Sequence, residues 1–312
     1  MEARKIITMG ETMVSLTGVD GCQLIKGPNL AMRIAGAESN TAIGLRRLGH
    51  ESVFISRVGT DSLGAFLRDC IATEGVNISY LREDENHPTG LMLKELLPNG
   101  ETTVWYYRNG SAASWMDESD VPESAIAEAD LLHITGITPV LSESCLKAVQ
   151  HAIQVAKTYG IPISFDPNIR KKLWKSQDFS PLIRDIIQEV TYLLTGKEEL
   201  YQLYGQGEVE TICKNLLNNS SLRYIVVKDG ANGAWGYGHE ETVFVEPYEC
   251  HPVDPVGAGD AFNAGFLAGM MEGKNLQIAC AMGAICGAKA TETYGEIESL
   301  PGRQVLEEKL NV

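Results

Sequence analysis

Apolar residues of this chain fall into short runs of strand length that alternate with stretches of helical periodicity. From residue 130 onward the alternation is regular, and each apolar run is followed by a helical repeat. Such an order predicts an α/β fold with a doubly wound, mostly parallel sheet flanked by helices. The expected strands are 5–9, 53–58, 130–135, 161–166, 190–195 and 223–228, with a hairpin at 234–237 and 243–247. The expected helices are 37–48, 61–74, 142–159, 180–188, 197–203, 208–218, 261–271 and 276–291.

Two segments depart from this alternation. Residues 12–35 alternate weakly, contain several glycines and lack helical periodicity, which indicates short strands and turns outside the main sheet. Strands expected at 89–95 and 102–108 flank a Pro-Asn-Gly sequence at 98–100, which favours a hairpin turn. We therefore expect a small β-sheet, formed by about 12–35 and 88–114, that covers the ligand-binding edge of the main sheet as a lid.

The composition narrows the possible partners. The 312 residues include 41 acidic and 26 basic side chains, so the formal net charge is −15. This balance argues against nucleic acid and weakens attraction to an anionic membrane. The 7 cysteines contain no Cys-x-x-Cys pair and the 6 histidines form no cluster, so neither a disulfide framework nor a protein-held transition metal is expected. The chain has no apolar stretch of about 18 residues and no signal-peptide core, so we expect a reduced, cytoplasmic compartment.

One stretch carries candidate chemistry. The helix expected at 261–271 is preceded by Asp254-Pro-Val-Gly257-Ala258-Gly259-Asp260. Two closely spaced glycines let the backbone approach a ligand, and free N–H groups at a helix amino terminus favour an anion such as phosphate. Asp260 would repel that anion unless it takes a proton from an attacking hydroxyl. The alternative interpretation is an acidic cap on an ordinary helix.

A second glycine cluster follows the strand expected at 223–228 and reads Lys228-Asp-Gly230-Ala-Asn-Gly233. It suits a turn that brings the backbone close to a nucleotide, although a hairpin turn uses the same residues. No Gly-x-x-x-x-Gly-Lys-[Ser/Thr] motif occurs, and no Gly-x-Gly-x-x-Gly follows a strand. A P-loop enzyme and a dinucleotide-dependent dehydrogenase are therefore disfavoured.

Two motifs give the chain a family resemblance. Gly36-Ala-Glu-Ser-Asn40-Thr-Ala-x-x-Leu-x-x-Leu-Gly49 is similar to the amino-terminal signature of the ribokinase-like (PfkB) sugar kinases, and 254–265 resembles their carboxyl-terminal signature. With the Lys228 cluster between them, the resemblance extends over nearly the whole chain and implies a ribokinase-like kinase domain over 1–312. The family pattern has Gly at position 35 and Thr at Val256, so a side-chain hydroxyl contact at 256 is expected to be lost.

The resemblance implies ATP-dependent phosphorylation of a sugar-like alcohol. Asp260 would take the hydroxyl proton, while N–H groups of the turn stabilise charge on the γ-phosphate. Magnesium would bridge the nucleotide phosphates, held mainly by water and phosphate oxygens rather than by a protein cage. The family's Asn-x-x-Glu motif appears as Thr195-Gly-Lys-Glu198, so Glu198 is expected to organise magnesium indirectly, and the role of Thr195 stays open. The expected catalytic residues are Asp260, Gly257, Ala258 and Gly259, and the expected nucleotide-binding residues are Lys228, Gly230, Gly233, Gly257 and Gly259.

The strand expected at 102–108 bears on the choice of substrate. Alternation places Tyr106 and Arg108 on one face, where a guanidinium and a phenol suit a carboxylate. An exposed aromatic strand with a solvated arginine is the alternative. Arg170 follows the strand expected at 161–166 and should reach the same edge of the sheet. Two converging arginines favour an acidic sugar over a neutral one.

Both stretches also resemble the 2-keto-3-deoxygluconate kinase branch of the family, in which Tyr-Tyr-Arg-x-x-Ser-Ala and Asp-Pro-Asn-x-Arg recur. This resemblance implies phosphorylation of 2-dehydro-3-deoxy-D-gluconate at its 6-hydroxyl. The alternatives are a fructokinase or other neutral-sugar kinase, a 5-dehydro-2-deoxygluconate kinase and, from a different class, a catalytically silent sugar-binding regulator. The intact Asp260 and its glycines disfavour the regulator. The residues expected to bind the sugar are Gly36, Asn40, Tyr106, Arg108, Arg170 and Asp260, together with Asp254 in a structural or hydroxyl-binding role.

The small sheet has edges that need cover, and pairing two copies across a twofold axis would supply it. The expected partners are therefore ATP, a small sugar acid and a second copy of the chain, in a homodimer or a dimer-based assembly. Neither nucleic acid nor a membrane is expected as a partner.

Overall fold

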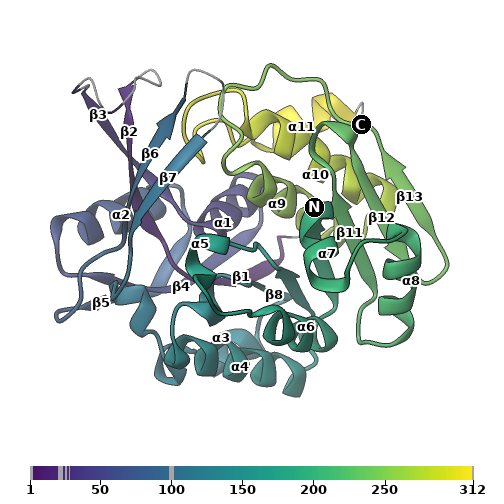
Figure 1. Cartoon of the computed structure of the whole chain (residues 1–312), viewed down its shortest axis with the longest axis horizontal. Helices are drawn as coiled ribbons and strands as arrows, with labels where there is room; N and C mark the ends of the chain where they lie inside the picture. Colours follow the sequence, from purple (N-terminus) through teal and green to yellow (C-terminus); the bar gives the residue numbers. More distant parts are fainter. Residues whose placement is uncertain (1–2, 20–23, 25–26, 28, 98–101, 311–312) are drawn as a thin grey trace.

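A nine-stranded sheet runs through the molecule (Figure 1). The computed structural model describes residues 3–19, 24, 27, 29–97 and 102–310. The strands are β1 (Lys5–Met9), β4 (Glu51–Gly59), β5 (Asn77–Asp84), β8 (Leu131–Thr135), β9 (Ile163–Asp166), β10 (Tyr192–Gly196), β11 (Tyr224–Lys228), β12 (Ala234–Gly238) and β13 (Thr242–Val245). They lie in the order β13-β12-β11-β10-β9-β8-β1-β4-β5. Pairing is parallel from β11 to β5 and antiparallel at β12 and β13.

Helices cover both faces of this sheet, so the expected doubly wound arrangement is confirmed. One apolar core packs against α1 (Ala37–Arg47), α2 (Ser62–Thr73), α9 (Ala258–Met271), α10 (Leu276–Ala290) and α11 (Arg303–Leu310). The other packs against α3 (Glu123–Ala127), α4 (Glu143–Thr158), α5 (Lys171–Trp174), α6 (Ser180–Glu189), α7 (Lys197–Tyr204) and α8 (Val209–Asn218). Central strands such as β8 are buried throughout, which explains their continuous apolar runs. Among the described residues, no helix has the length and apolar content to cross a membrane.

A second, four-stranded sheet stands apart from the large one, beside α2 (Figure 1). Its strands are β2 (Met13–Gly18), β3 (Leu30–Ala35), β6 (Leu91–Leu96) and β7 (Thr102–Tyr107), in the order β3-β2-β6-β7. The expectation that two distant segments build one small sheet is therefore confirmed. The turn expected at 98–100 lies outside the described residues, as do Gly21 and Pro28 of the first segment.

Several elements differ from the expectations. Helix α9 begins at Ala258 rather than at 261, because Gly257 caps it in the left-handed conformation with φ 88°. Asp260 therefore lies within the first turn of the helix and not before it. The sequence pattern does not predict β5, because this edge strand is mostly exposed and lacks an apolar run. It also misses α3, α5 and α11, which are short and bury few apolar side chains.

The carboxyl ends of the central strands meet at one edge of the large sheet. Thr135 at the end of β8 pairs in register with Asp166 at the end of β9, and Gly196 of β10 pairs with Lys228 of β11. Polar residues that are far apart in the chain are thereby brought side by side, at the edge where open α/β sheets bind ligands.

Candidate active site

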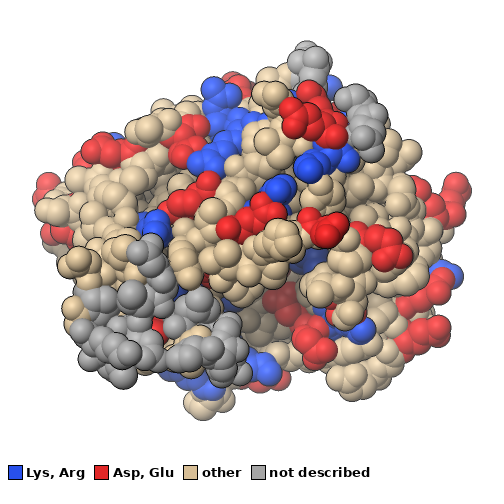
Figure 2. Space-filling view, turned by 90° about the horizontal axis from the view of Figure 1, so that it is seen from above, with Lys and Arg blue, Asp and Glu red and all other residues tan. Residues whose placement is uncertain are grey.

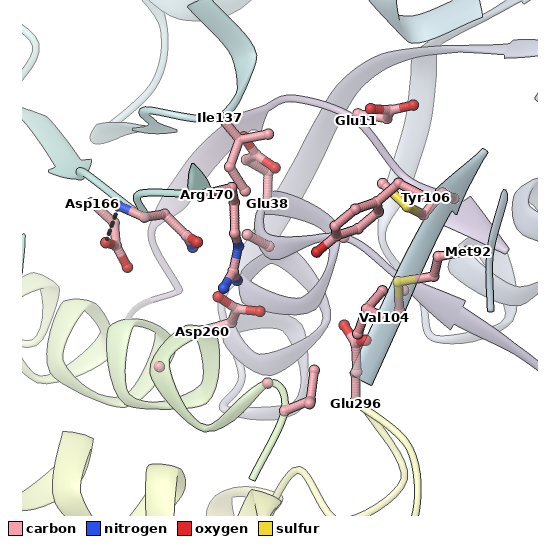
Figure 3. Close-up of a pocket in the computed structure, with 18 of the residues that line it drawn as sticks. Glu11, Glu38, Met92, Val104, Tyr106, Ile137, Asp166, Arg170, Asp260 and Glu296 are labelled. Carbon is pink, nitrogen blue, oxygen red and sulfur yellow. Dashed lines mark hydrogen bonds between the residues drawn. The ribbon is translucent and has the colours of Figure 1, made fainter. Parts of the chain in front are cut away.

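A cavity of about 470 Å³ lies between this edge and the small sheet (Figure 3). One wall is the inner face of the small sheet, and the other is formed by the ends of β9 to β11 and by the start of α9. The small sheet contributes Met13, Ala35, Met92, Thr102, Val104 and Tyr106, and the adjoining loop contributes Arg108. The opposite wall includes Gly36, Glu38, Asp166, Asn168, Arg170, Glu199, Lys228, Val256, Gly257, Gly259, Asp260 and Glu296.

The first turn of α9 offers an anion site. A Cβ on Gly257 would lie 3.0 Å from the Glu296 carbonyl oxygen, so both space and φ require glycine. The N–H of Ala258 makes only a long contact of 3.4 Å to the Pro255 carbonyl oxygen. Gly259 is the next residue of this turn and lines the cavity. These amides and the helix dipole face the cavity and favour negative charge there.

Asp260 is buried at the same place and shares a partner with a second carboxylate. Asn40 Nδ2 on α1 donates to Asp260 Oδ2 at 2.9 Å and to Glu296 Oε2 at 2.8 Å. Burial raises the pKa of Asp260 to about 7, the Asn40 hydrogen bond opposes that rise, and the charge of Glu296 adds to it. The Asp260 carboxylate thus binds a side chain on another helix. A carboxylate that merely capped α9 would instead bind N–H groups of α9 itself. A carboxylate with this pKa suits a general base near neutral pH.

Lys228 supplies a cation next to the α9 turn. Its Nζ donates to Asp166 Oδ2 and to Asn263 Oδ1, each at 3.0 Å, and Asn263 Nδ2 also donates to Asp166 at 2.6 Å. The nearest atom to a Cβ built on Gly259 is this Nζ, at 3.7 Å. The side chain is therefore held rigidly beside the helix terminus, where its charge and the backbone N–H groups act on the same anion.

The two candidate arginines have different surroundings. Arg108 is buried, donates from Nε to Glu11 Oε2 at 2.7 Å and lies over the Tyr106 ring at 5.5 Å from its centroid. Its charge is thus already paired. Arg170 is exposed to the cavity and points toward Asp260 (Figure 3), and no hydrogen bond of its guanidinium is recorded among the described residues. Arg170 is therefore the cation with its donors available to a ligand.

Gly36 precedes α1 with φ 145°, and a Cβ there would lie 2.5 Å from the Glu11 carbonyl oxygen. Only glycine fits this junction between the small sheet and α1. Gly36 thereby sets the position of Asn40 within the first turns of α1, and it lines the cavity itself.

Other residues singled out in the sequence lie outside the cavity lining. Asp254 is buried and its carboxylate accepts from Lys94 Nζ at 2.5 Å. Gly230 and Gly233 have φ 53° and 93°, and a Cβ on Gly233 would lie 2.4 Å from the carbonyl oxygen of Val245. The close packing of the hairpin is therefore enough to explain why position 233 is a glycine, and no ligand is needed to explain it.

The helical phase of α7 places Glu199, and not Glu198, in the cavity lining. Glu198 is exposed and borders a separate outer pocket. Glu199 Oε2 accepts from the Gly196 N–H at 2.8 Å, and its Oε1 accepts from the Ile169 N–H at 2.7 Å. Burial raises the pKa of Glu199, and the charge of Asp166 adds to this rise.

Three further carboxylates of the cavity are not singled out by the sequence patterns. Glu11 follows the first strand, Glu38 lies inside the motif that contains Asn40, and Glu296 lies in an irregular segment with no signal of its own. Glu38 is the one with a visible signal, because it lies two residues after Gly36 in the first turn of α1. Burial raises the pKa of Glu38, whose Oε1 accepts hydroxyl hydrogen bonds while Oε2 has no partner among described residues.

The comparison with known families identifies the class of protein. Residues 3–303 match the model of the pfkB family of carbohydrate kinases, and the chain belongs to this family. It is accordingly a phosphotransferase with an alcohol group as acceptor. A 2-dehydro-3-deoxygluconokinase of Bacillus subtilis is 33% identical over 303 residues, covering 96% of this chain and 93% of that protein. A fructokinase of Escherichia coli is 29% identical over 310 residues, covering 97% and 98%.

Solved structures of other proteins have the same fold as this chain. A protein of Escherichia coli described as a ribokinase II, in complex with ATP and Mg²⁺, superposes with a TM-score of 0.89 at 26% identity and covers 99% of both chains. A 2-dehydro-3-deoxygluconokinase of Thermotoga maritima gives a TM-score of 0.92 at 22% identity, covering 100% of this chain and 99% of that one. The second likeness shows the shared ribokinase-like fold.

The raised pKa of Asp260 predicts how the kinase responds to pH. Because only the ionised carboxylate accepts a proton, kcat/KM should rise with pH, with its midpoint at about 7. In Asn40→Ala the ionised form loses a hydrogen bond, so the inflection should move to higher pH. Steady-state kinetics between pH 5 and 9 measure both curves. An inflection that stays in place in Asn40→Ala would contradict the assigned contact.

Proposed function

We propose that this kinase transfers the γ-phosphate of ATP to the 6-hydroxyl of 2-dehydro-3-deoxy-D-gluconate, giving ADP and the 6-phosphate. The observation that carries the proposal is the cation Arg170, which faces the cavity with its donors available close to Asp260 and Tyr106. A guanidinium in this setting suits an acidic sugar, because its donors can form charge-assisted hydrogen bonds to a carboxylate that a neutral sugar lacks. The 33% identity to a 2-dehydro-3-deoxygluconokinase supports the same substrate.

The remaining groups divide the work of the reaction. Asp260 accepts the proton of the attacking hydroxyl, and the N–H groups of Gly257, Ala258 and Gly259 stabilise the charge on the transferred phosphoryl group. Lys228 adds a positive charge beside them. Arg108, oriented by Glu11, acts with the Tyr106 phenol on the substrate's acidic end. Gly36 and Asn40 complete the sugar site. Asp254 has a structural role and does not bind a substrate hydroxyl.

ATP and Mg²⁺ are the cosubstrate and cofactor that the cavity suits. The described residues contain no group of three metal ligands, which fits Mg²⁺ held mainly by phosphate oxygens and water. Glu199, whose carboxylate borders the cavity near Asp166, would hold the ion's water, with Glu198 one residue away. The ion would neutralise charge on the nucleotide phosphates. Gly230 and Gly233 would let the turn that follows Lys228 lie close to the nucleotide.

The main alternative is a neutral-sugar kinase such as a fructokinase, favoured by the 29% identity to an Escherichia coli fructokinase. A 5-dehydro-2-deoxygluconate kinase would use the same arginines. Both alternatives keep Asp260 as the base and differ from the proposal in the acceptor that they favour. A panel of acceptors therefore separates them.

A coupled ADP-release assay should give its highest kcat/KM with 2-dehydro-3-deoxygluconate among that acid, 5-dehydro-2-deoxygluconate, fructose and ribose. Arg170→Ala should raise the KM for the acid by roughly 10- to 100-fold, because it removes a charged hydrogen bond of about 1.5–3 kcal/mol. The exposed Arg223 provides the control Arg223→Ala, which should behave as wild type. Faster turnover of fructose or ribose than of the acid would overturn the assignment.

We also propose that two copies pair through the outer face of the small sheet. In register across this sheet, Met32 lies opposite Leu16, Leu16 opposite Leu93, and Leu93 opposite Trp105. Met32 is 44% and Trp105 43% exposed. An apolar row of this kind on a sheet face marks a surface that a partner covers.

Trp105→Lys combined with Met32→Lys should convert a dimer into a monomer, because two charges would have to be buried in the interface. Light scattering after size exclusion gives the mass. Tyr159→Lys is the matched control, since Tyr159 is 57% exposed at the end of α4, away from the small sheet. A dimeric double variant, or a monomeric wild type, contradicts the proposed interface.

A further inference from the structure

A buried ion pair joins the small sheet to the opposite wall of the cavity. Lys94 lies on β6 at the next position of the face that carries the cavity residue Met92. Its Nζ donates to Asp254 Oδ2 at 2.5 Å, and the two side chains are only 5% and 3% exposed. None of the roles described above uses Lys94, and the cavity lining does not include it.

Asp254 connects this lysine to both segments that border Asp260. Its Oδ1 accepts from the Val256 N–H at 3.2 Å, within the turn that leads into α9. Its Oδ2 accepts from the Gly295 N–H at 3.2 Å, next to Glu296. The carboxylate therefore holds the α9 turn and the Glu296 segment together, and Lys94 supplies its positive charge.

The charge of Lys94 also reaches Glu296. Burial raises the pKa of Glu296, and the charge of Lys94 is the strongest effect that opposes this rise. Withdrawal of Lys94 would thus leave two buried carboxylates, Asp254 and Glu296, with less compensation. A buried charge that loses its partner is strongly unfavourable, so the ion pair favours the arrangement in which the small sheet and the turn are held together.

Two other contacts between the small sheet and the main body lie nearer to solvent. Arg33 Nη1 on β3 contacts Glu298 Oε1 at 3.0 Å, with side chains 23% and 32% exposed. Lys172 Nζ donates to the Val104 carbonyl oxygen at 2.7 Å in an exposed setting. Neither contact touches the turn before α9. Of these three contacts, that of Lys94 is the one that reaches the turn, through Asp254.

We propose that Lys94 is a positioning residue that makes closure of the small sheet and assembly of the anion-binding turn a single event. With Lys94 on Asp254, the cavity is closed and the Val256 N–H is held so that the amides of Gly257 to Gly259 face the phosphate. When the pair separates, the sheet opens for substrates and the turn relaxes. The proposal rests on the kinase activity, and its assay uses the sugar acid proposed above.

This coupling has a chemical consequence. Closure excludes water from the transferred phosphoryl group. With the sheet displaced, a water oxygen forms the new bond to the γ-phosphorus, the bond to the ADP oxygen breaks, and the water gives up a proton to solvent. ATP is then hydrolysed to ADP and inorganic phosphate without phosphorylating the sugar.

The test compares wild type with Lys94→Met and with the double variant Lys94→Met plus Asp254→Asn. The double variant removes the uncompensated carboxylate and thereby protects the fold. ADP and sugar phosphate are quantified in the same reactions, and amide hydrogen exchange is followed in β6 and β7 without ligands. Wild type should form equal amounts of both products. Both variants should release more ADP than sugar phosphate, exchange faster in β6 and β7, and lose roughly 10²-fold in kcat/KM for the sugar.

Arg33→Met is the matched control, because it breaks another ion pair between the small sheet and the body without touching the turn. It should keep the products equal. If the folded variants at Lys94 show equal products and wild-type exchange, Lys94 is only a structural residue and the proposal is wrong. If wild type phosphorylates no sugar acid, the proposed substrate fails instead, and the exchange rates alone decide the role of Lys94.

Discussion

A single side-chain amide, that of Asn40, holds two buried carboxylates at the amino terminus of α9. Burial opposes ionisation of Asp260 and Glu296, and the charge of Glu296 raises the pKa of Asp260 further. The shared amide and the charge of Arg170 oppose this rise and keep the pKa of Asp260 at about 7. Asn40 lies on α1 and Asp260 on α9, so the packing of these two helices sets the distance between base and amide. The active site therefore depends on the core of the large sheet.

Local charges inside the cavity explain how a protein with a negative net charge can bind anions. The net charge is −15, and Figure 2 shows acidic side chains interspersed with basic ones on the face seen from above. At the surface such charges are screened within about 8 Å at physiological salt. Inside the cavity, Arg170 and Lys228 lie with the first amides of α9, and charges lined by protein are screened less than charges at the surface. An acidic protein can therefore attract an anion locally, without an overall basic charge.

Sequence patterns predict the fold and part of the site for a physical reason. Strands of a parallel sheet end at one edge, so residues that follow them, such as Asp166, Arg170 and Lys228, converge whatever their separation in the chain. Glu296 and Lys94 escape prediction because their roles depend on tertiary contacts alone. Glu199 lines the cavity in place of Glu198 because of the rotational position of the two residues on α7. The motif that begins at Thr195 does not predict this position, because Thr195 differs from the family's Asn. The edge strand β5 has no apolar face to reveal it.

The central claim is that Asp260 acts as the base beside the amides that hold the phosphate, and Asp260→Asn tests it most directly. Asparagine keeps the shape of the side chain and its contact with Asn40 but accepts no proton. ATP affinity is measured by calorimetry, and sugar-phosphate formation by rapid-quench single turnover. The account predicts a loss of roughly 10²-fold or more in the transfer rate with nearly unchanged ATP binding. A transfer rate close to that of wild type, with ATP bound as tightly, would contradict it.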